Sequence, residues 1–203
     1  MNPSVGPEFF NDIYARNIDP WGFETSEYER LKYADTLAQL PPGRFRSGLE
    51  IGCSTGVLSG ILADRCDRLL GVDFAEAALA EARRRHAGRS DLAFSRLHLP
   101  GEKPAGHFDL IVLSEILYFM DRDDVQATAR VVGQLGELGA TVILAHWLGN
   151  SADHPLHADE AVEAFIVSAS NFASPVKNVR REGYRLDLLQ IASEGDDEPF
   201  RVR

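Results

Sequence analysis

A glycine-rich turn between two apolar segments constrains the fold of this chain most. Residues 49–56 read Leu-Glu-Ile-Gly-Cys-Ser-Thr-Gly, and a second apolar segment, Leu69–Val72, ends at Asp73. Glycines let a backbone turn sharply and approach a ligand closely. An aspartate at the end of the following strand is placed to accept hydrogen bonds from a ribose. The two segments therefore predict a unit that binds a nucleoside.

Apolar segments of strand length alternate with amphipathic segments along most of the chain. We expect seven strands, at residues 47–51, 69–72, 92–97, 108–113, 140–145, 176–181 and 184–191. The continuous apolar run at 108–113 is typical of a buried parallel strand. This alternation predicts an α/β fold. We expect a Rossmann-like doubly wound sheet of seven strands, mostly parallel with an antiparallel C-terminal hairpin strand, and helices on both faces.

The chain divides into three parts by pattern. Residues 1–42 are expected to form an N-terminal helical lid, residues 43–193 a cofactor-binding core, and residues 194–203 an acidic tail. Within the lid, Ser26 is predicted to cap a helix, with Glu29 completing a capping box. The predicted apolar face of that helix carries Leu31, Ala34, Leu37 and Ala38.

The formal net charge of −10 opposes binding to nucleic acid, which needs a basic surface. Because there is no signal peptide and no apolar run long enough to span a bilayer, we expect a cytoplasmic protein without membrane partners. It is expected to be a monomer or homodimer that binds a small molecule.

Cys53 and Cys66 form neither a disulfide framework nor a metal cluster. His154 and His157 have a spacing that can share a metal on a helix, but Pro155 argues against one, so no metal is expected.

Three kinds of glycine turn compete for residues 50–56. A phosphate-binding loop needs Gly-Lys-Ser/Thr, and none follows Gly52. A dinucleotide fingerprint needs Gly-x-Gly-x-x-Gly, but Ser54 stands at its second glycine. The pattern Glu-x-Gly-x-x-x-Gly resembles class I S-adenosylmethionine-dependent methyltransferases, which usually have a middle glycine where this chain has Ser54. Glu50 agrees with this, because a carboxylate repels a pyrophosphate and attracts a ligand ammonium. A plain strand–helix connection whose glycines serve packing is the alternative.

Other segments resemble a narrower family, the nodulation protein S family. They are Asp19-Pro20-Trp21, Tyr28-Glu29-Arg30, residues 49–56, residues 108–118 and Tyr184–Asp187. The resemblance implies a methyltransferase that uses S-adenosyl-L-methionine. Since members of that family methylate the free amine of a deacetylated glucosamine on a chitin oligosaccharide, it also implies N-methylation of an amino sugar or related amine. An O-methyltransferase of a sugar or natural product, and a non-catalytic nucleoside-binding module, are the other hypotheses.

The predicted cofactor-binding residues lie around the turn, the strand ends and the lid. They are Trp21, Arg30, Glu50, Gly52, Cys53, Gly56, Asp73, Phe74, Leu97, His98 and Ser114. Trp21 either packs over a sulfonium, which an aromatic face attracts, or anchors a helix. Arg30 either pairs with the methionine carboxylate or is a surface charge. His98 stands where the superfamily often has an acid near the adenine, so backbone groups or another side chain are expected to recognise the adenine.

The candidates for contacting the acceptor are Glu115, Tyr118 and His146. An amine must be neutral to attack a methyl group, and a nearby carboxylate or imidazole can take its proton. Glu115 is the first choice for contacting the amine, although an acid at a helix start is also explained by the helix dipole. Tyr118 either walls the pocket or packs in the core. His146 is either a base near neutral pH or a hydrogen-bonded histidine at a strand end.

Overall fold

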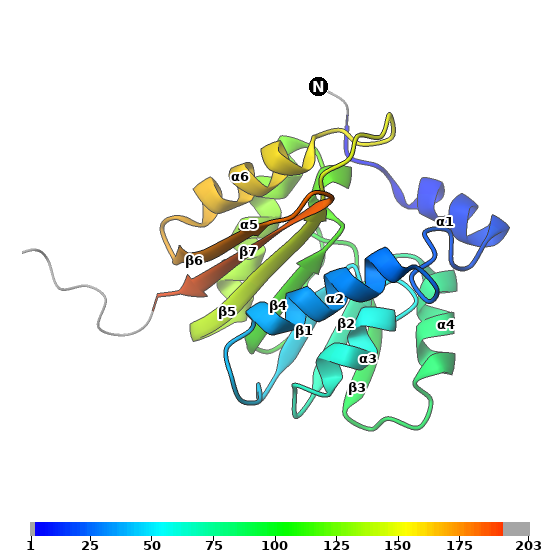
Figure 1. Ribbon diagram of the computed structural model, residues 1–203, viewed down its shortest axis with the longest axis horizontal. Helices are drawn as coiled ribbons and strands as arrows, with labels where there is room; N and C mark the ends of the chain where they lie inside the picture. Colours follow the sequence, from blue (N-terminus) through cyan, green and yellow to red (C-terminus); the bar gives the residue numbers. More distant parts are fainter. Residues whose placement is uncertain (1–2, 193–203) are drawn as a thin grey trace, which may run out of the picture.

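A seven-stranded sheet forms the centre of the computed structural model, which describes residues 3–192 (Figure 1). Its order is β3-β2-β1-β4-β5-β7-β6. The strands are β1 (Gly48–Ile51), β2 (Leu69–Asp73), β3 (Leu92–Arg96), β4 (Phe108–Ser114), β5 (Gly136–Trp147), β6 (Ala173–Arg180) and β7 (Tyr184–Ile191). Strands β1 to β5 pair in parallel, whereas β7 pairs antiparallel with β5 and β6. The predicted α/β class, the strand number and the antiparallel hairpin are confirmed.

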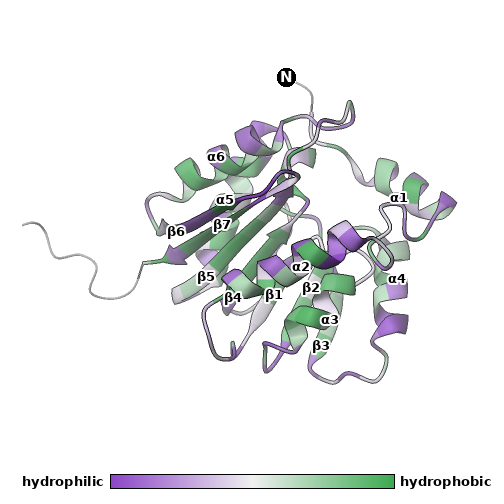
Figure 2. Ribbon diagram, in the orientation of Figure 1, coloured by the Kyte–Doolittle hydropathy of each residue, from purple (hydrophilic) through white to green (hydrophobic). Residues whose placement is uncertain are grey.

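Helices cover both faces of the sheet. They are α1 (Pro7–Arg16), α2 (Glu27–Gln39), α3 (Val57–Ala63), α4 (Glu76–Arg85), α5 (Arg122–Leu135) and α6 (Ala158–Ala169), with a 3₁₀ turn η1 at Leu117–Phe119. Successive side chains of β4 point to opposite faces of the sheet. Ile111 and Leu113 pack with α5 and α6, whereas Leu110 and Val112 pack on the side of α2 and α3 (Figure 1). The inner strands are hydrophobic and the edge strand β6 is hydrophilic (Figure 2).

The buried face of α2 differs from the prediction. Its predicted apolar face is wrong, because Leu31, Ala34 and Ala38 are exposed and only Leu37 of that set packs against the core. The residues that are buried recur at helical spacing and are mostly polar: Glu29, Lys32, Tyr33 and Thr36. Glu29, Lys32 and Tyr33 on this inner face line a cavity, and Lys32 is buried there between carboxylates. Ser26 caps the helix as predicted, since its Oγ accepts from the amide of Glu29 at 3.3 Å. Glu29 does not complete the capping box, because the Ser26 amide donates to the Gly22 carbonyl and the Glu29 carboxylate accepts from Lys32.

Strand β5 is longer than the predicted segment 140–145 and includes His146. The N-terminal segment is tied to the segment after β4, because the Val5 amide donates to the Phe119 carbonyl at 2.8 Å. Helix α1 lies beside the end of the sheet at which β1 and β2 finish (Figure 1).

The predicted tail at 194–203 lies outside the described residues. None of the helices in residues 3–192 combines the length and apolar character that crossing a membrane requires.

Candidate active site

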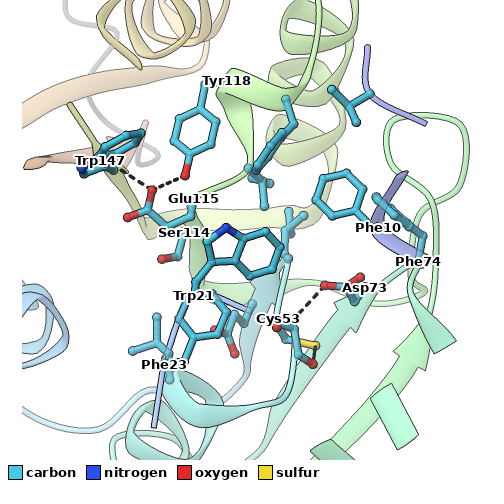
Figure 3. A pocket seen from close by; sticks show the side chains of 18 of the residues that line it. Phe10, Trp21, Phe23, Cys53, Asp73, Phe74, Ser114, Glu115, Tyr118 and Trp147 are labelled. Carbon is cyan, nitrogen blue, oxygen red and sulfur yellow. Dashed lines mark hydrogen bonds between the residues drawn. The ribbon is translucent and has the colours of Figure 1, made fainter. Parts of the chain in front are cut away.

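A cavity of about 480 Å³ opens at the carboxyl ends of β1, β2 and β4. The sheet changes direction of winding between β1 and β4, and ligands of such sheets bind at this switch point. Figure 3 shows two ends of the cavity on either side of Trp21: Phe10, Cys53, Asp73 and Phe74 at one end, and Glu115, Tyr118 and Trp147 at the other. We call these the Asp73 end and the Glu115 end.

Two glycines shape the turn after β1 in different ways. Gly52 has φ of +81°, and a Cβ there would lie 2.1 Å from Ile116 Cγ2, so this position excludes any side chain. Gly56 has φ of +76° and caps α3, where a Cβ would lie 3.0 Å from Ala82 Cβ. Gly52 lines the cavity. Gly56 does not line it, because its place is beneath the cavity, where α3 approaches α4.

Asp73 holds the turn in place at its end of the cavity. Its Oδ2 accepts from the Ser54 amide and its Oδ1 from the Ala75 amide, both at 2.9 Å. Burial raises the pKa of this carboxyl despite those bonds. The side chain remains partly exposed and lines the cavity, and each oxygen keeps a lone pair for a further donor. A carboxylate fixed in this way fits the vicinal hydroxyls of a ribose.

Aromatic side chains close the cavity above the turn. The Tyr14 hydroxyl lies 2.6 Å from Ser54 Oγ, and its ring meets that of Trp21 edge-on at 5.7 Å. The Phe10 ring contacts Phe74 at 5.0 Å. Trp21 leaves 40% of its surface exposed, which is large for an indole held among aromatic rings. Sequence reasoning missed Phe10 and Tyr14, because only the folding of α1 over the strand ends brings them to the turn.

Glu50 lies at the base of the cavity rather than at its mouth. Its side chain is buried, and one carboxylate oxygen accepts from the Ser59 hydroxyl. Burial raises the pKa of Glu50 to about 8, so the group is largely protonated at neutral pH. The sequence suggested that Glu50 carries a charged carboxylate. In the fold, a cationic ligand beside Glu50 is needed for its carboxyl to be ionised at neutral pH.

The buried carboxyl makes a prediction about stability. The pKa of Glu50 is about 8 in the fold and near its ordinary value in the unfolded chain, so the native state holds this proton more tightly. Its contribution to stability is present at low pH and declines as pH rises towards 8. Relative to Glu50→Gln, the wild type should lose about 1.4 kcal/mol per pH unit between roughly pH 5 and pH 8. Urea unfolding at several pH values measures the free energy of unfolding of both proteins. The same dependence of this free energy on pH in the two proteins would contradict the prediction.

Glu115 is held from three directions at its end of the cavity. It has φ of +59°, a left-handed conformation that is uncommon for a residue with a side chain. Its Oε2 accepts from the Tyr118 hydroxyl at 2.5 Å and from the Trp147 amide at 2.9 Å. Its Oε1 accepts from Lys32 Nζ. Glu115 lines the cavity, and its contact with an acceptor amine stays a prediction. The residue precedes a 3₁₀ turn and not an α-helix.

Lys32 is a site residue that sequence reasoning missed. It is only 1% exposed, bridges Glu115 to Glu29 and lies 3.0 Å from Glu29 Oε1. Its ammonium also lies 5.0 Å from the centre of the Tyr28 ring, a cation–π distance. Burial is the largest single influence on the pKa of Glu115 and favours the neutral carboxyl. The charge of Lys32, the neighbouring His146 and the hydrogen bonds from Lys32 and Tyr118 together outweigh it, so the pKa of Glu115 stays below its usual range. The available signal was the polar stripe 29, 32, 33 and 36, which has helical spacing.

The structure brings most of the predicted residues to the cavity. Those that line it are Trp21, Glu50, Gly52, Cys53, Asp73, Phe74, Leu97, His98, Ser114, Glu115 and Tyr118. Arg30 does not, because it lies on the outer side of α2 and pairs with Glu27 at 2.6 Å. His146 does not either, since it is buried within β5 and its Nε2 accepts from the Leu117 amide at 3.1 Å. Burial lowers the pKa of His146 to about 4, so its ring stays neutral.

Strand order, glycine turn and the acid at the end of β2 together define the class I methyltransferase fold. The N-methyltransferase NodS from Bradyrhizobium japonicum WM9, solved with S-adenosyl-L-homocysteine, superposes with a TM-score of 0.79 at 23% identity, covering 92% of this chain and 99% of that one. A Pseudomonas syringae structure described as a putative methyltransferase is 33% identical with a TM-score of 0.70, covering 81% of this chain and 99% of that one.

The chain belongs to the nodulation protein S family, whose model matches residues 10–151. A nodulation protein S of Bradyrhizobium diazoefficiens is 34% identical over 114 residues, which are 56% of this chain and 54% of that protein. Another, from Rhizobium tropici, is 30% identical over 118 residues, which are 58% of this chain and 49% of that protein. The chain therefore spans about half the length of the curated relatives it matches.

Proposed function

We propose that this chain is an S-adenosylmethionine-dependent methyltransferase that acts on a small polar acceptor, and that the acceptor group is the amine of an amino sugar or a related amine. The observation that carries the proposal is one continuous cavity with Asp73 at one end and Glu115 at the other. Membership of the nodulation protein S family supports it.

The residues at the Asp73 end fit the proposed cofactor. Asp73 would accept from the ribose hydroxyls, and the backbone of the Gly52–Ser54 turn would approach the methionine part closely. Trp21 offers an exposed aromatic face, which attracts a cationic sulfur. When bound, the cofactor supplies a methyl group on that sulfur. The residues around it position the acceptor against the methyl group and exclude water.

The charges at the Glu115 end support an amine over a hydroxyl. The carboxylates of Glu115 and Glu29 face one ammonium, that of Lys32, so the group as a whole attracts a cation. Glu115 keeps lone-pair capacity for another donor, because its two oxygens accept three hydrogen bonds. In our proposal Glu115 and Tyr118 hold the amine of the acceptor near the methyl group.

Mass spectrometry of methylated products tests this proposal. The protein is incubated with S-adenosylmethionine and a chitin oligosaccharide whose terminal unit carries a free amine, and separately with the fully N-acetylated oligosaccharide. We expect methyl transfer to the free amine alone, since an acetylated nitrogen has no lone pair available for attack. Equal transfer to both would indicate a hydroxyl acceptor. Cofactor binding without transfer to any of a panel of amines would indicate a non-catalytic module.

A further inference from the structure

An amine acceptor that arrives as an ammonium must lose a proton before it attacks, and Glu115 is poorly suited to take it. Three donors already hold the Glu115 carboxylate, and one of them is the ammonium of Lys32. A carboxylate stabilised in this way stays ionised and binds a proton weakly near neutral pH. It can orient an amine, but a different group must accept the proton.

The imidazoles of the described residues differ in their access to the Glu115 end. His146 is fully buried beneath the cavity, and its Nε2 is occupied by the Leu117 amide. His98 lines the other end, where its ring contacts Phe74 at 5.2 Å. His154 lines the Glu115 end and comes from the loop between β5 and α6.

Aromatic contacts hold the His154 ring in place. It stacks on the Tyr118 ring at 4.1 Å with an interplanar angle of 18°. The rings of Phe119 and Trp147 meet it edge-on at 4.8 and 6.1 Å. Tyr118, on which it stacks, donates its hydroxyl to Glu115. Within residues 3–192 no protein group makes a hydrogen bond to the His154 ring nitrogens, so the imidazole is positioned through its faces while its nitrogens stay free.

We infer that His154 is the proton acceptor for the amine, and that Glu115 orients the amine without taking its proton. This inference rests on the proposed function. A ring nitrogen of His154 takes one proton from the acceptor ammonium, which leaves a neutral amine with a lone pair. That lone pair forms the new N–C bond while the S–C bond breaks, and the sulfur keeps the bonding electrons. The imidazolium then releases its proton to solvent, and the methylated product leaves as an ammonium.

The charges around His154 are consistent with this assignment. Burial is the largest influence and lowers the pKa of the ring below its usual value. Asp153 from the same loop and Glu115 across the cavity act in the opposite direction, and His157 acts with burial. Lys32 of α2 lies behind Glu115 and compensates part of its charge. The ring is therefore neutral and able to accept a proton at neutral pH.

The variant His154→Gln tests the inference, because glutamine keeps a polar planar end but does not titrate. We expect kcat/KM for the amine-terminated chitin oligosaccharide to fall roughly 100-fold, the lower range for loss of an acid–base group. The acidic limb of the pH profile should disappear, whereas affinity for S-adenosylhomocysteine should stay unchanged. His107→Gln, at an exposed histidine, is the matched control and should behave as the wild type.

Titration of the histidine rings by NMR gives a readout that needs no acceptor. In wild-type protein saturated with S-adenosylhomocysteine, the resonance absent from His154→Gln should titrate with a pKa below 6.5, the ordinary value. A His154 ring that is protonated at neutral pH would overturn the inference. So would an active wild type whose pH profile His154→Gln preserves. A wild type that methylates none of the amines instead overturns the proposed function, and the inference falls with it.

Discussion

Replacing Asp73 with alanine should weaken S-adenosylhomocysteine binding by about 100-fold, or on the order of 3 kcal/mol. The variant removes a carboxylate that faces the cavity and that would accept hydrogen bonds from two ribose hydroxyls. It also frees the Ser54 amide, which Asp73 holds at 2.9 Å, so the glycine turn loses its anchor. Calorimetric titration of the purified variant measures the change in affinity.

Asp109 provides a matched control at the opposite end of the parallel strands. Its carboxylate also accepts from two backbone amides, Arg46 at 2.8 Å and Ser47 at 2.9 Å, but it lies near the start of β4. Asp109→Ala should therefore lower stability and leave affinity unchanged. If Asp73→Ala bound the ligand as tightly as the wild type, the end of β2 would not be the ribose site.

Replacing Lys32 with methionine should lower the free energy of unfolding by about 3–5 kcal/mol, the range for breaking a buried ion pair from one side. Methionine fills similar space but carries no charge, so Glu115 and Glu29 would remain buried without their shared cation. The pKa of Glu115 should rise in this variant, because the charge that lowers it is gone. Urea denaturation measures the loss of stability.

Two further variants separate the ion pair from a general effect of losing a lysine. Lys103→Met changes an exposed lysine that donates to Gln134, and its effect should stay within about 0.5 kcal/mol. Lys32→Met combined with Glu115→Gln should recover part of the lost stability, since one uncompensated charge is removed. A Lys32→Met protein as stable as the wild type would show that the two carboxylates do not depend on this ammonium.

The sheet could be predicted from sequence because its strands carry their own signals. The apolar runs ending at Glu50–Gly52, Asp73 and Ser114 have the length and burial of parallel strands, and the structure has strands there. Since carboxyl ends of parallel strands gather at one edge, the same runs also indicated which residues line the cavity. The limits of β5 were less visible, because its first residues, Gly136–Gly139, are only weakly apolar.

The orientation of α2 and the Glu115 end were harder to predict, because they depend on contacts between distant segments. Apolar spacing put Leu31 inside, but α2 turns its polar stripe inward and Lys32 meets Glu115 across 83 positions of the chain. The same orientation of α2 directs Arg30 outward, where it pairs with Glu27. His154 drew attention only for its metal-like spacing from His157, and nothing in the sequence placed it at the cavity, because only the loop after β5 brings it against Tyr118.

Calorimetric titration of the wild-type protein with S-adenosylhomocysteine and with NAD tests most directly the claim that the cavity at the ends of β1 and β2 takes an S-adenosyl ligand. We expect saturable one-to-one binding of S-adenosylhomocysteine and no binding of NAD, since Ser54 breaks the dinucleotide spacing. Saturable binding of NAD without binding of S-adenosylhomocysteine would contradict it.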